Sequence, residues 1–184
     1  MKPNEEATIE LQKQEKYIRF NKWCKDNGVK APSLEYPVAF GKEGKLVGVR
    51  AKKEVGMYES YLYVPIAMTI NEEQFKKSEV GHLFPQFEDQ FAEKSNFEHI
   101  LLIFFVTHEL IKGEKSFWYP YFEIAEDADL PMLWPKKDLS LIEDMALRAA
   151  ITEQKEDLEE EYEETVDFLR EFCPEYDISS FTSQ

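Results

Sequence analysis

The sequence predicts an α+β protein in which a small β region lies between helical segments. Between residues 29 and 65, prolines and glycines interrupt short apolar runs, a pattern typical of short strands joined by tight turns. Apolar residues recur at helical spacing before and after this region. The 184 residues are 43 % hydrophobic and 14 % aromatic, which is enough for one packed domain, or one domain with an appendage.

The β region is expected to hold three short strands, at residues 36–40, 46–51 and 61–64. Residues 41–44, with a glycine at each end, are predicted to form the hairpin loop between the first two strands. A polar turn that contains Gly56 is expected to connect the second strand to the third, which stops at Pro65.

Four helical segments are expected around the strands. The first covers residues 5–27 and ends at Gly28, a residue common just after helices. The second begins after Asn71, whose side chain can cap a helix. The third covers 96–112, opens with the Ser95–Glu98 capping box, ends at Gly113 and is expected to be buried nearly all round.

The fourth helical segment lies within residues 139–172, after an aromatic and proline-rich stretch at 114–135 that is expected to pack irregularly. From residue 153 to 164 it carries eight acidic residues and one lysine. An apolar stripe predicts an amphipathic helix rather than a disordered tail. The stripe consists of Leu158, Tyr162, Thr165, Leu169 and Phe172.

The charge and composition restrict the partners and the location that we expect. A net charge of −15 disfavours nucleic acid, which is bound by clustered Lys and Arg, and makes a basic protein surface a more natural partner. The longest apolar run, at 100–106, has seven residues, whereas a membrane-spanning helix needs about twenty. With no CxxC pair, Cys24 and Cys173 are expected to be reduced thiols. We therefore expect a soluble cytoplasmic or nuclear protein without a signal peptide.

Common catalytic and metal motifs do not occur in the sequence. His108 is followed by Glu109, but the second histidine of HExxH is missing, and His82, His99 and His108 are interpreted as helix-surface or helix-end residues. No GxSxG elbow, GxGxxG motif or phosphate loop occurs. The acidic run has helical spacing rather than that of a calcium loop. The aromatic cluster at 118–121 is interpreted as core, with a ligand platform as the alternative.

Several motifs, taken in chain order, resemble the SET protein methyltransferases typified by Rubisco large-subunit lysine methyltransferase and actin-histidine methyltransferase. Ser116-Phe-Trp-Tyr-Pro-Tyr121, after a buried helix, is the most specific of them. The other matching residues and stretches are Phe20, Trp23, Gly28, 46–49, 54–59, 64–65, 68–71, 78–81, Trp134, Leu139 and Leu141.

This resemblance implies a SET-like N-terminal β unit with packed helices and the start of a helical insert. It implies an N-terminal helix at 1–28, the N-terminal part of the SET-like domain at 29–150 and the start of an acidic insert at 151–184. It also implies S-adenosylmethionine as cofactor and a lysine or histidine of a protein as substrate. The residues expected to approach the cofactor through their backbone are Lys45, Leu46, Val47 and Gly48.

Two departures from the family pattern affect the expected activity. The leading glycine of the family's G-x-G turn is Leu46 here, and a bulky residue hinders the close approach of a ligand to the backbone. The family's downstream Asn-His motif and active-site tyrosine are not found. The chain alone is therefore expected to be incomplete and inactive, with no catalytic residue assigned. The alternatives are a non-catalytic acidic protein-interaction module on a SET-like scaffold and an unrelated α+β protein without a cofactor.

Overall fold

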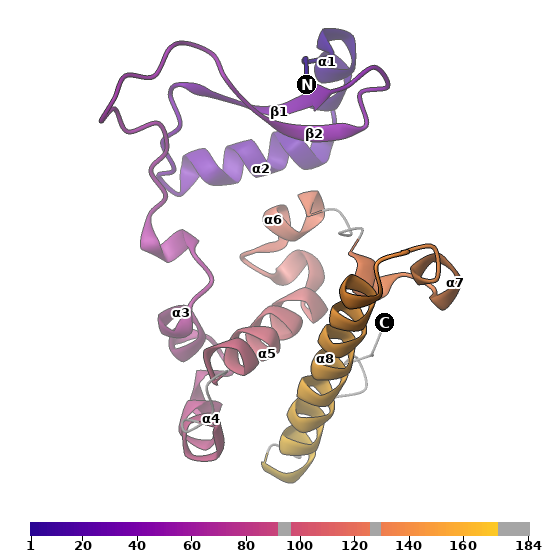
Figure 1. Ribbon diagram of the computed structural model, residues 1–184. Helices are drawn as coiled ribbons and strands as arrows, with labels where there is room; N and C mark the ends of the chain where they lie inside the picture. Colours follow the sequence, from indigo (N-terminus) through magenta and orange to yellow (C-terminus); the bar gives the residue numbers. More distant parts are fainter. Residues whose placement is uncertain (92–96, 126–129, 173–184) are drawn as a thin grey trace. The chain divides into compact units, whose positions relative to one another are not determined.

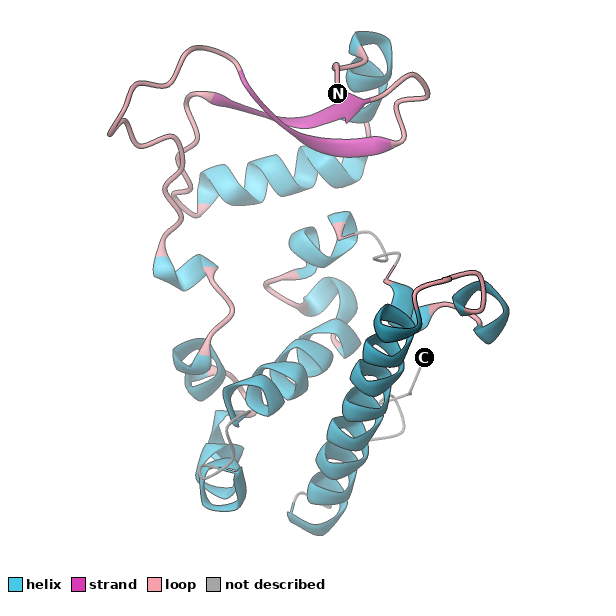
Figure 2. Cartoon of the chain, viewed as in Figure 1, coloured by secondary structure: helices cyan, strands magenta, loops and turns pink. Residues whose placement is uncertain are grey.

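The computed structural model describes residues 1–91, 97–125 and 130–172, without the side chains of Gln90, Phe91 and Phe172 (Figure 1). Helices predominate and one two-stranded sheet is present (Figure 2), so the expected mixture of helix and strand is confirmed. The chain forms two compact units. Unit 1 contains Met1–Ile70 and Glu114–Ala125, and unit 2 contains Asn71–Gly113 and the described residues after Glu126.

Unit 1 begins with two helices where the sequence predicted one. Helix α1 spans Glu5–Gln12 and helix α2 spans Glu15–Asp26. Gln14 has extended backbone angles, φ −71° and ψ 133°, so the helical ladder breaks there. The break lets each helix bury its own residue, Thr8 from α1 and Tyr17 from α2. Gly28 follows α2 with φ +83°, and the predicted end of the helix is confirmed.

The sheet of unit 1 is an antiparallel hairpin of β1 (Leu34–Phe40) and β2 (Leu46–Ala51). Ala39 pairs with Val47, and the ladder is irregular between Glu35 and Val38. Gly41 and Gly44, which bracket the loop, have φ of +82° and +66°, a backbone conformation that glycine adopts at little cost. The predicted hairpin loop is confirmed.

The prediction of a third strand at 61–64 is wrong. Only an isolated bridge forms there, in which Lys30 and Tyr63 exchange backbone hydrogen bonds of 2.9 and 2.8 Å. This bridge ties the segment to the chain after α2 instead of to β2, and the residues of 61–64 are each at least 40 % exposed. The segment leads into a short 3₁₀ helix, η1 (Ile66–Met68).

The aromatic stretch of unit 1 is more regular than expected. After the 3₁₀ turn η3 (Gly113–Lys115), residues Tyr119–Ile124 form helix α6, which packs on α2. The Trp23 ring lies 5.4 Å from that of Phe117 and 6.1 Å from that of Trp118, between centroids. The aromatic residues of the Ser116–Tyr121 motif thus join α2 and α6 within unit 1.

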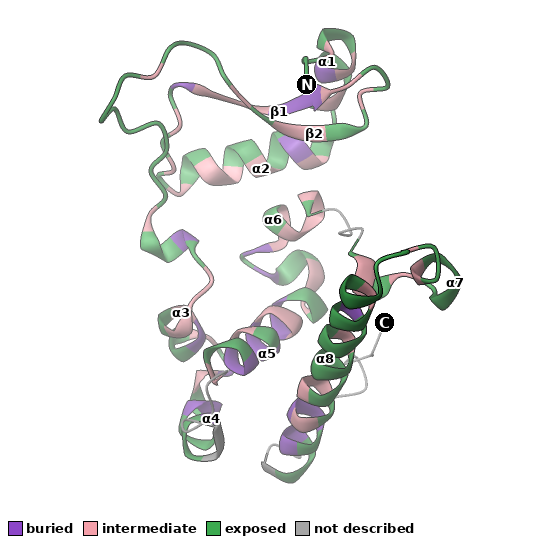
Figure 3. Ribbon diagram, in the orientation of Figure 1, coloured by how far each residue is buried: buried purple, intermediate pink, exposed green. Residues whose placement is uncertain are grey.

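Unit 2 is helical and holds a phenylalanine core. Its elements are α3 (Glu72–Lys77), η2 (Gly81–Leu83), α4 (Phe84–Phe91), α5 (Phe97–Ile111), η4 (Pro131–Leu133), α7 (Lys136–Leu139) and α8 (Met145–Phe172). Phe75 makes ring contacts with Phe84, Phe87, Phe104 and Phe105. Phe168 of α8 packs on Phe87 with 4.4 Å between centroids. Figure 3 shows buried residues along α5 and, on α8, mostly toward its C-terminal end.

The helices of unit 2 confirm most of the local predictions. The Asn71 side chain accepts the Gln74 N–H at 3.0 Å and caps α3. Helix α5 has the expected extent. Ile103 is 36 % and Leu110 51 % exposed, so the prediction that this helix is buried nearly all round is wrong. Ser95 lies outside the described residues.

Helix α8 confirms part of the predicted apolar stripe. Thr165 and Leu169 are buried, near Phe168, which packs on Phe87 of α4, whereas Leu158 is 43 % exposed. The side chain of Phe172 is not described. Within residues 1–91, 97–125 and 130–172, no helix has the length and apolar character needed to cross a membrane.

Candidate functional site

The residues predicted to approach the cofactor lie at the start of β2. Lys45 precedes the strand and pairs with Glu43 at 2.6 Å, and the Leu46 side chain is 58 % exposed. A Cβ atom on Gly48 would lie 3.1 Å from Cε2 of Phe40, so glycine here lets that ring rest against β2. Val47 continues the ladder opposite Ala39. Cofactor binding by these four residues stays a prediction.

A pocket of about 820 Å³ lies entirely in unit 1. The four predicted residues 45–48 do not line it, whereas Val49, the next residue along β2, does. The size of the pocket is within the range of about 300–1,000 Å³ usual for small-molecule sites. Aromatic residues of α2, β1, α6 and the N-cap of α6 form much of its wall. They are Phe20, Trp23, Tyr36, Trp118 and Tyr121.

The pocket also contains polar groups. The Nε1 atom of Trp23 is buried and has no acceptor among the described residues. Lys25, Lys52 and Glu35 line the pocket, and the charge of Lys52 helps to lower the pKa of Glu35, after the hydrogen bonds from Arg50 and Gln12. An apolar ligand with a hydrogen-bond acceptor for the Trp23 N–H would complement this set.

The thiol of Cys24 lines the same pocket. Burial raises the pKa of Cys24, so the thiol is held in its neutral form, which is a poor nucleophile. We assign it no covalent chemistry. The prediction of a reduced thiol at Cys173 falls outside the described residues.

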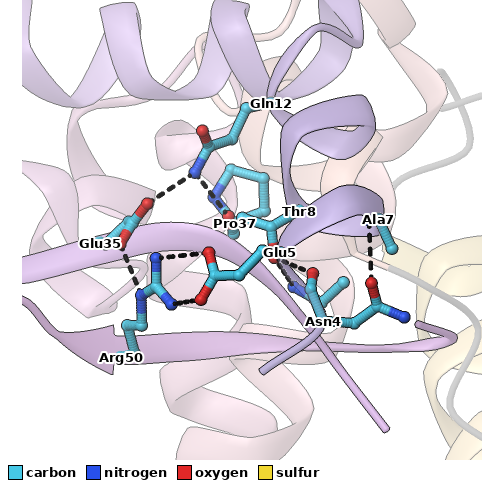
Figure 4. Close-up of polar contacts among 9 residues, drawn as sticks. Asn4, Glu5, Ala7, Thr8, Gln12, Glu35, Pro37 and Arg50 are labelled. Atoms are coloured by element: carbon cyan, nitrogen blue, oxygen red, sulfur yellow. Dashed lines mark hydrogen bonds and ion pairs between the residues drawn. The ribbon is translucent and has the colours of Figure 1, made fainter. Parts of the chain in front are cut away.

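Beside the pocket, an ion-pair network connects α1 to the hairpin (Figure 4). Arg50 Nε donates to Glu35 at 2.7 Å, and its Nη2 donates to Glu5 at 3.1 Å. Gln12 Nε2 donates to the other oxygen of Glu35 at 3.0 Å. The hydrogen bonds from Arg50 lower the pKa of both carboxyl groups. Sequence reasoning missed this network because Glu5 and Arg50 are 45 positions apart and no local pattern relates them.

Unit 2 holds a second polar cluster around His108. This residue is 8 % exposed, and its Nε2 lies 2.9 Å from Glu79 Oε1. Lys112 lies 3.3 Å from the same oxygen and 2.8 Å from Glu109. Hydrogen bonds from His108 and then Lys112 lower the pKa of Glu79. His108 lies in the last turn of α5, which fits the helix-end interpretation. It is buried rather than on the surface, because Phe104 and Glu79 contact it.

His82 and His99 are exposed, as interpreted from the sequence. In the part of the chain that the structure describes, no three His, Cys, Asp or Glu side chains are grouped so that they could hold a metal ion.

Comparisons with known proteins extend this picture. No protein-family model matches the chain. The actin-histidine N-methyltransferase of Xenopus tropicalis is 29 % identical over 122 residues, which are 66 % of this chain and 20 % of the relative. Those of Mus musculus and Homo sapiens are 25 % identical over 138 residues, 74 % of this chain and 22 % of the relative.

A solved structure of Rubisco LSMT bound to sinefungin and monomethyllysine has a similar fold. The TM-score is 0.67 at 22 % identity, over 91 % of this chain and 36 % of that chain. The chain thus spans about a fifth of the length of the curated relatives it matches. The resemblance to SET methyltransferases that the motifs indicated is confirmed, since both named members of that family are found.

Proposed function

We propose that this chain supplies the cofactor-side portion of a SET-type, S-adenosylmethionine-dependent protein methyltransferase. The observation that carries the proposal is the fold likeness to Rubisco LSMT over 91 % of the chain. The sequence similarity to actin-histidine N-methyltransferases supports it independently. Sinefungin, which is bound in the Rubisco LSMT structure, is an analogue of S-adenosylmethionine.

In this proposal the backbone of Lys45, Leu46, Val47 and Gly48 meets the cofactor, and the adjoining pocket accepts its apolar part. The aromatic walls and the unpartnered Trp23 N–H suit a flat ring with acceptor atoms. When bound, S-adenosylmethionine supplies an electrophilic methyl group for a substrate nitrogen. This chain contributes orientation and exclusion of water, and we assign none of its residues a proton-transfer role.

The first test is isothermal titration of chain 1–184 with S-adenosylmethionine. We expect weak or undetectable binding, because Leu46 stands where the family has a glycine. Leu46→Gly restores that glycine and is expected to strengthen binding, whereas the control Leu46→Ala, which keeps a Cβ atom, is expected to help less. Equal affinities of all three chains, or tightest binding by the unaltered chain, would contradict the site assignment.

The second test is methyl transfer to actin, followed by mass spectrometry of the histidine and lysine residues. We expect no turnover by chain 1–184 alone, because the family's Asn-His and tyrosine groups are not found in it. Turnover by this chain would show that the catalytic groups lie within it and that the proposed lack of activity is wrong.

The second candidate is an acidic interaction module on the same scaffold, and one observation favours it. Helix α8 exposes Glu153, Glu156, Asp157, Glu159, Glu160 and Glu163 to solvent. Such a face attracts basic surfaces through forces that salt screens. We expect retention on polylysine resin that decreases as salt rises.

The variants for this candidate keep the total charge equal. Glu156→Gln, Glu160→Gln and Glu163→Gln together remove three carboxylates from α8, and Glu6→Gln, Glu10→Gln and Glu15→Gln remove three from α1 and α2. Loss of retention in the first triple variant alone would support the module. Equal retention by the two triple variants would mean that net charge, not α8, binds the resin.

A further inference from the structure

Helix α1 buries little apolar surface against the rest of unit 1. Among residues 5–12, all of which the structure describes, Thr8 alone is buried, and Ile9 is 53 % exposed. The helix has eight residues, and the break at Gln14 separates it from α2. Because isolated helices shorter than about 12–15 residues are marginal in water, α1 depends on its contacts with the hairpin to stay helical.

Polar contacts hold α1 and the residue before it to the hairpin (Figure 4). Asn4 N–H donates to Ala39 O at 2.8 Å, and Thr8 Oγ1 accepts the Ala39 N–H at 3.0 Å. Further contacts join Glu5 to Arg50 and Gln12 to Glu35 and Pro37 O. All of them lie within residues 4–50, which the structure describes without a gap. A segment with few buried apolar contacts opens at a lower free energy than the core.

The segment before α1 also holds the loop of the hairpin. Asn4 caps α1 through its Oδ1, and its Nδ2 donates to Lys42 O at 3.1 Å. Gly41 N–H donates to Lys2 O at 3.2 Å. The start of α1 is therefore linked directly to the loop that leads into β2.

We propose that residues 1–12 form a detachable strap, which opens and closes as one unit on the edge of β1 and on the hairpin loop while the β1–β2 ladder stays intact. Release frees the Ala39 N–H and C=O and removes the support of the loop. Since α1 is too short to stand alone, release also melts it. The strap then has two states, a closed helix and an open coil.

The role of the strap rests on the proposed function, whereas its opening does not. The hairpin loop leads into residues 45–48, so closure of the strap would set how these residues approach the cofactor. The opening is a property of the hairpin and the strap alone. Its test therefore contains no S-adenosylmethionine.

Native-state hydrogen exchange of ¹⁵N-labelled chain 1–184, followed by NMR, tests the opening because adjacent residues of β1 report different contacts. The Ala39 N–H is bonded to the strap, whereas Phe40 pairs with Leu46 in the ladder. Successive residues of an antiparallel strand direct their backbone groups to opposite edges, so Phe40 reports the hairpin alone. We expect the amides of Thr8, Ala39 and Gly41 to share one protection factor, about tenfold or more below that of Phe40.

A matched pair of variants tests what fastens the strap. Glu5→Gln weakens the contact with Arg50 and is expected to lower the protection factors of the three strap amides about threefold, the size typical of an exposed ion pair. The protection factor of Phe40 should not change. Glu6→Gln is the control, because Glu6 is exposed in the same turn of α1 and its replacement removes an equal charge.

Three outcomes would overturn the proposal. Equal protection of Ala39 and Phe40 would mean that the strap opens only when the hairpin unfolds. Unequal protection among the amides of Thr8, Ala39 and Gly41 would mean that the strap is not one unit. Equal effects of Glu5→Gln and Glu6→Gln would mean that Arg50 does not fasten it. None of these results bears on cofactor binding, which the titration tests separately.

Discussion

The hydroxyl of Thr8 is a single group on which two backbone segments depend. It donates to Asn4 O at 2.7 Å and accepts the Ala39 N–H at 3.0 Å, with Thr8 2 % exposed. Thr8→Val keeps the shape but leaves the buried Ala39 N–H without an acceptor, which costs about 1–3 kcal/mol. Urea unfolding should show this loss. Thr8→Ser keeps the hydroxyl and should lose less, so a larger loss for serine would contradict the hydrogen-bond explanation.

The junction of α3 and η2 requires the glycine at position 81. A Cβ atom there would lie 2.2 Å from Lys76 O and 2.9 Å from Phe75 O, both backbone atoms that cannot rotate away. We expect Gly81→Ala to lower the free energy of unfolding by about 1–3 kcal/mol. Gly56→Ala is the control: its nearest atom is Glu59 Oε2 at 3.7 Å, and we expect a change within about 0.5 kcal/mol. Similar effects of the two variants in chemical denaturation would contradict this account.

The attachment of α1 to the hairpin should depend on pH. The pKa values of Glu5 and Glu35 are lowered in the folded protein, first by their hydrogen bonds with Arg50. Their contribution to stability is therefore present above the ordinary carboxyl pKa and is lost as pH falls through the lowered values. Urea midpoints measured from neutral pH into the acid range should fall less steeply for Glu35→Gln than for the unaltered chain. A steeper fall in the variant would contradict this assignment.

At the scale of the whole molecule, the net charge of −15 opposes folding through self-repulsion. Salt screens this repulsion, with a Debye length of about 10 Å at 0.1 M. Thermal unfolding should therefore shift to higher temperature as sodium chloride is added. Choline chloride at equal ionic strength should give the same shift. A response to one cation only would indicate specific ion binding instead of screening.

The sequence predicted those features that depend on local chemistry. The Asn71 cap, the glycines at 41 and 44 and the extent of α5 follow from residues a few positions apart. The break at Gln14 and the missing strand at 61–64 could not be predicted in that way. Both features depend on hydrogen bonds between residues that are far apart in the sequence. Near the break at Gln14, Thr8 accepts the Ala39 N–H. At 61–64, Tyr63 bonds to Lys30.

Cofactor binding at the start of β2 follows from the family resemblance and stays a prediction. The pocket beside it combines segments of unit 1 from α2 to α6, which the sequence did not predict. The Arg50 network joins residues up to 45 positions apart. No periodicity or spacing in the sequence reports contacts of that range, so the pocket and the network required a three-dimensional structure.

The contact between Trp23 and Trp118 has an optical consequence. Two indole chromophores with centroids 6.1 Å apart and planes inclined at 71° form a chiral pair, so their ultraviolet transitions couple and yield a paired positive and negative circular dichroism band. This pair of bands reports directly, in solution, whether α6 packs on α2. Replacing Trp23 or Trp118 by phenylalanine would abolish this paired band and leave the ordinary bands of the remaining indole and of Trp134.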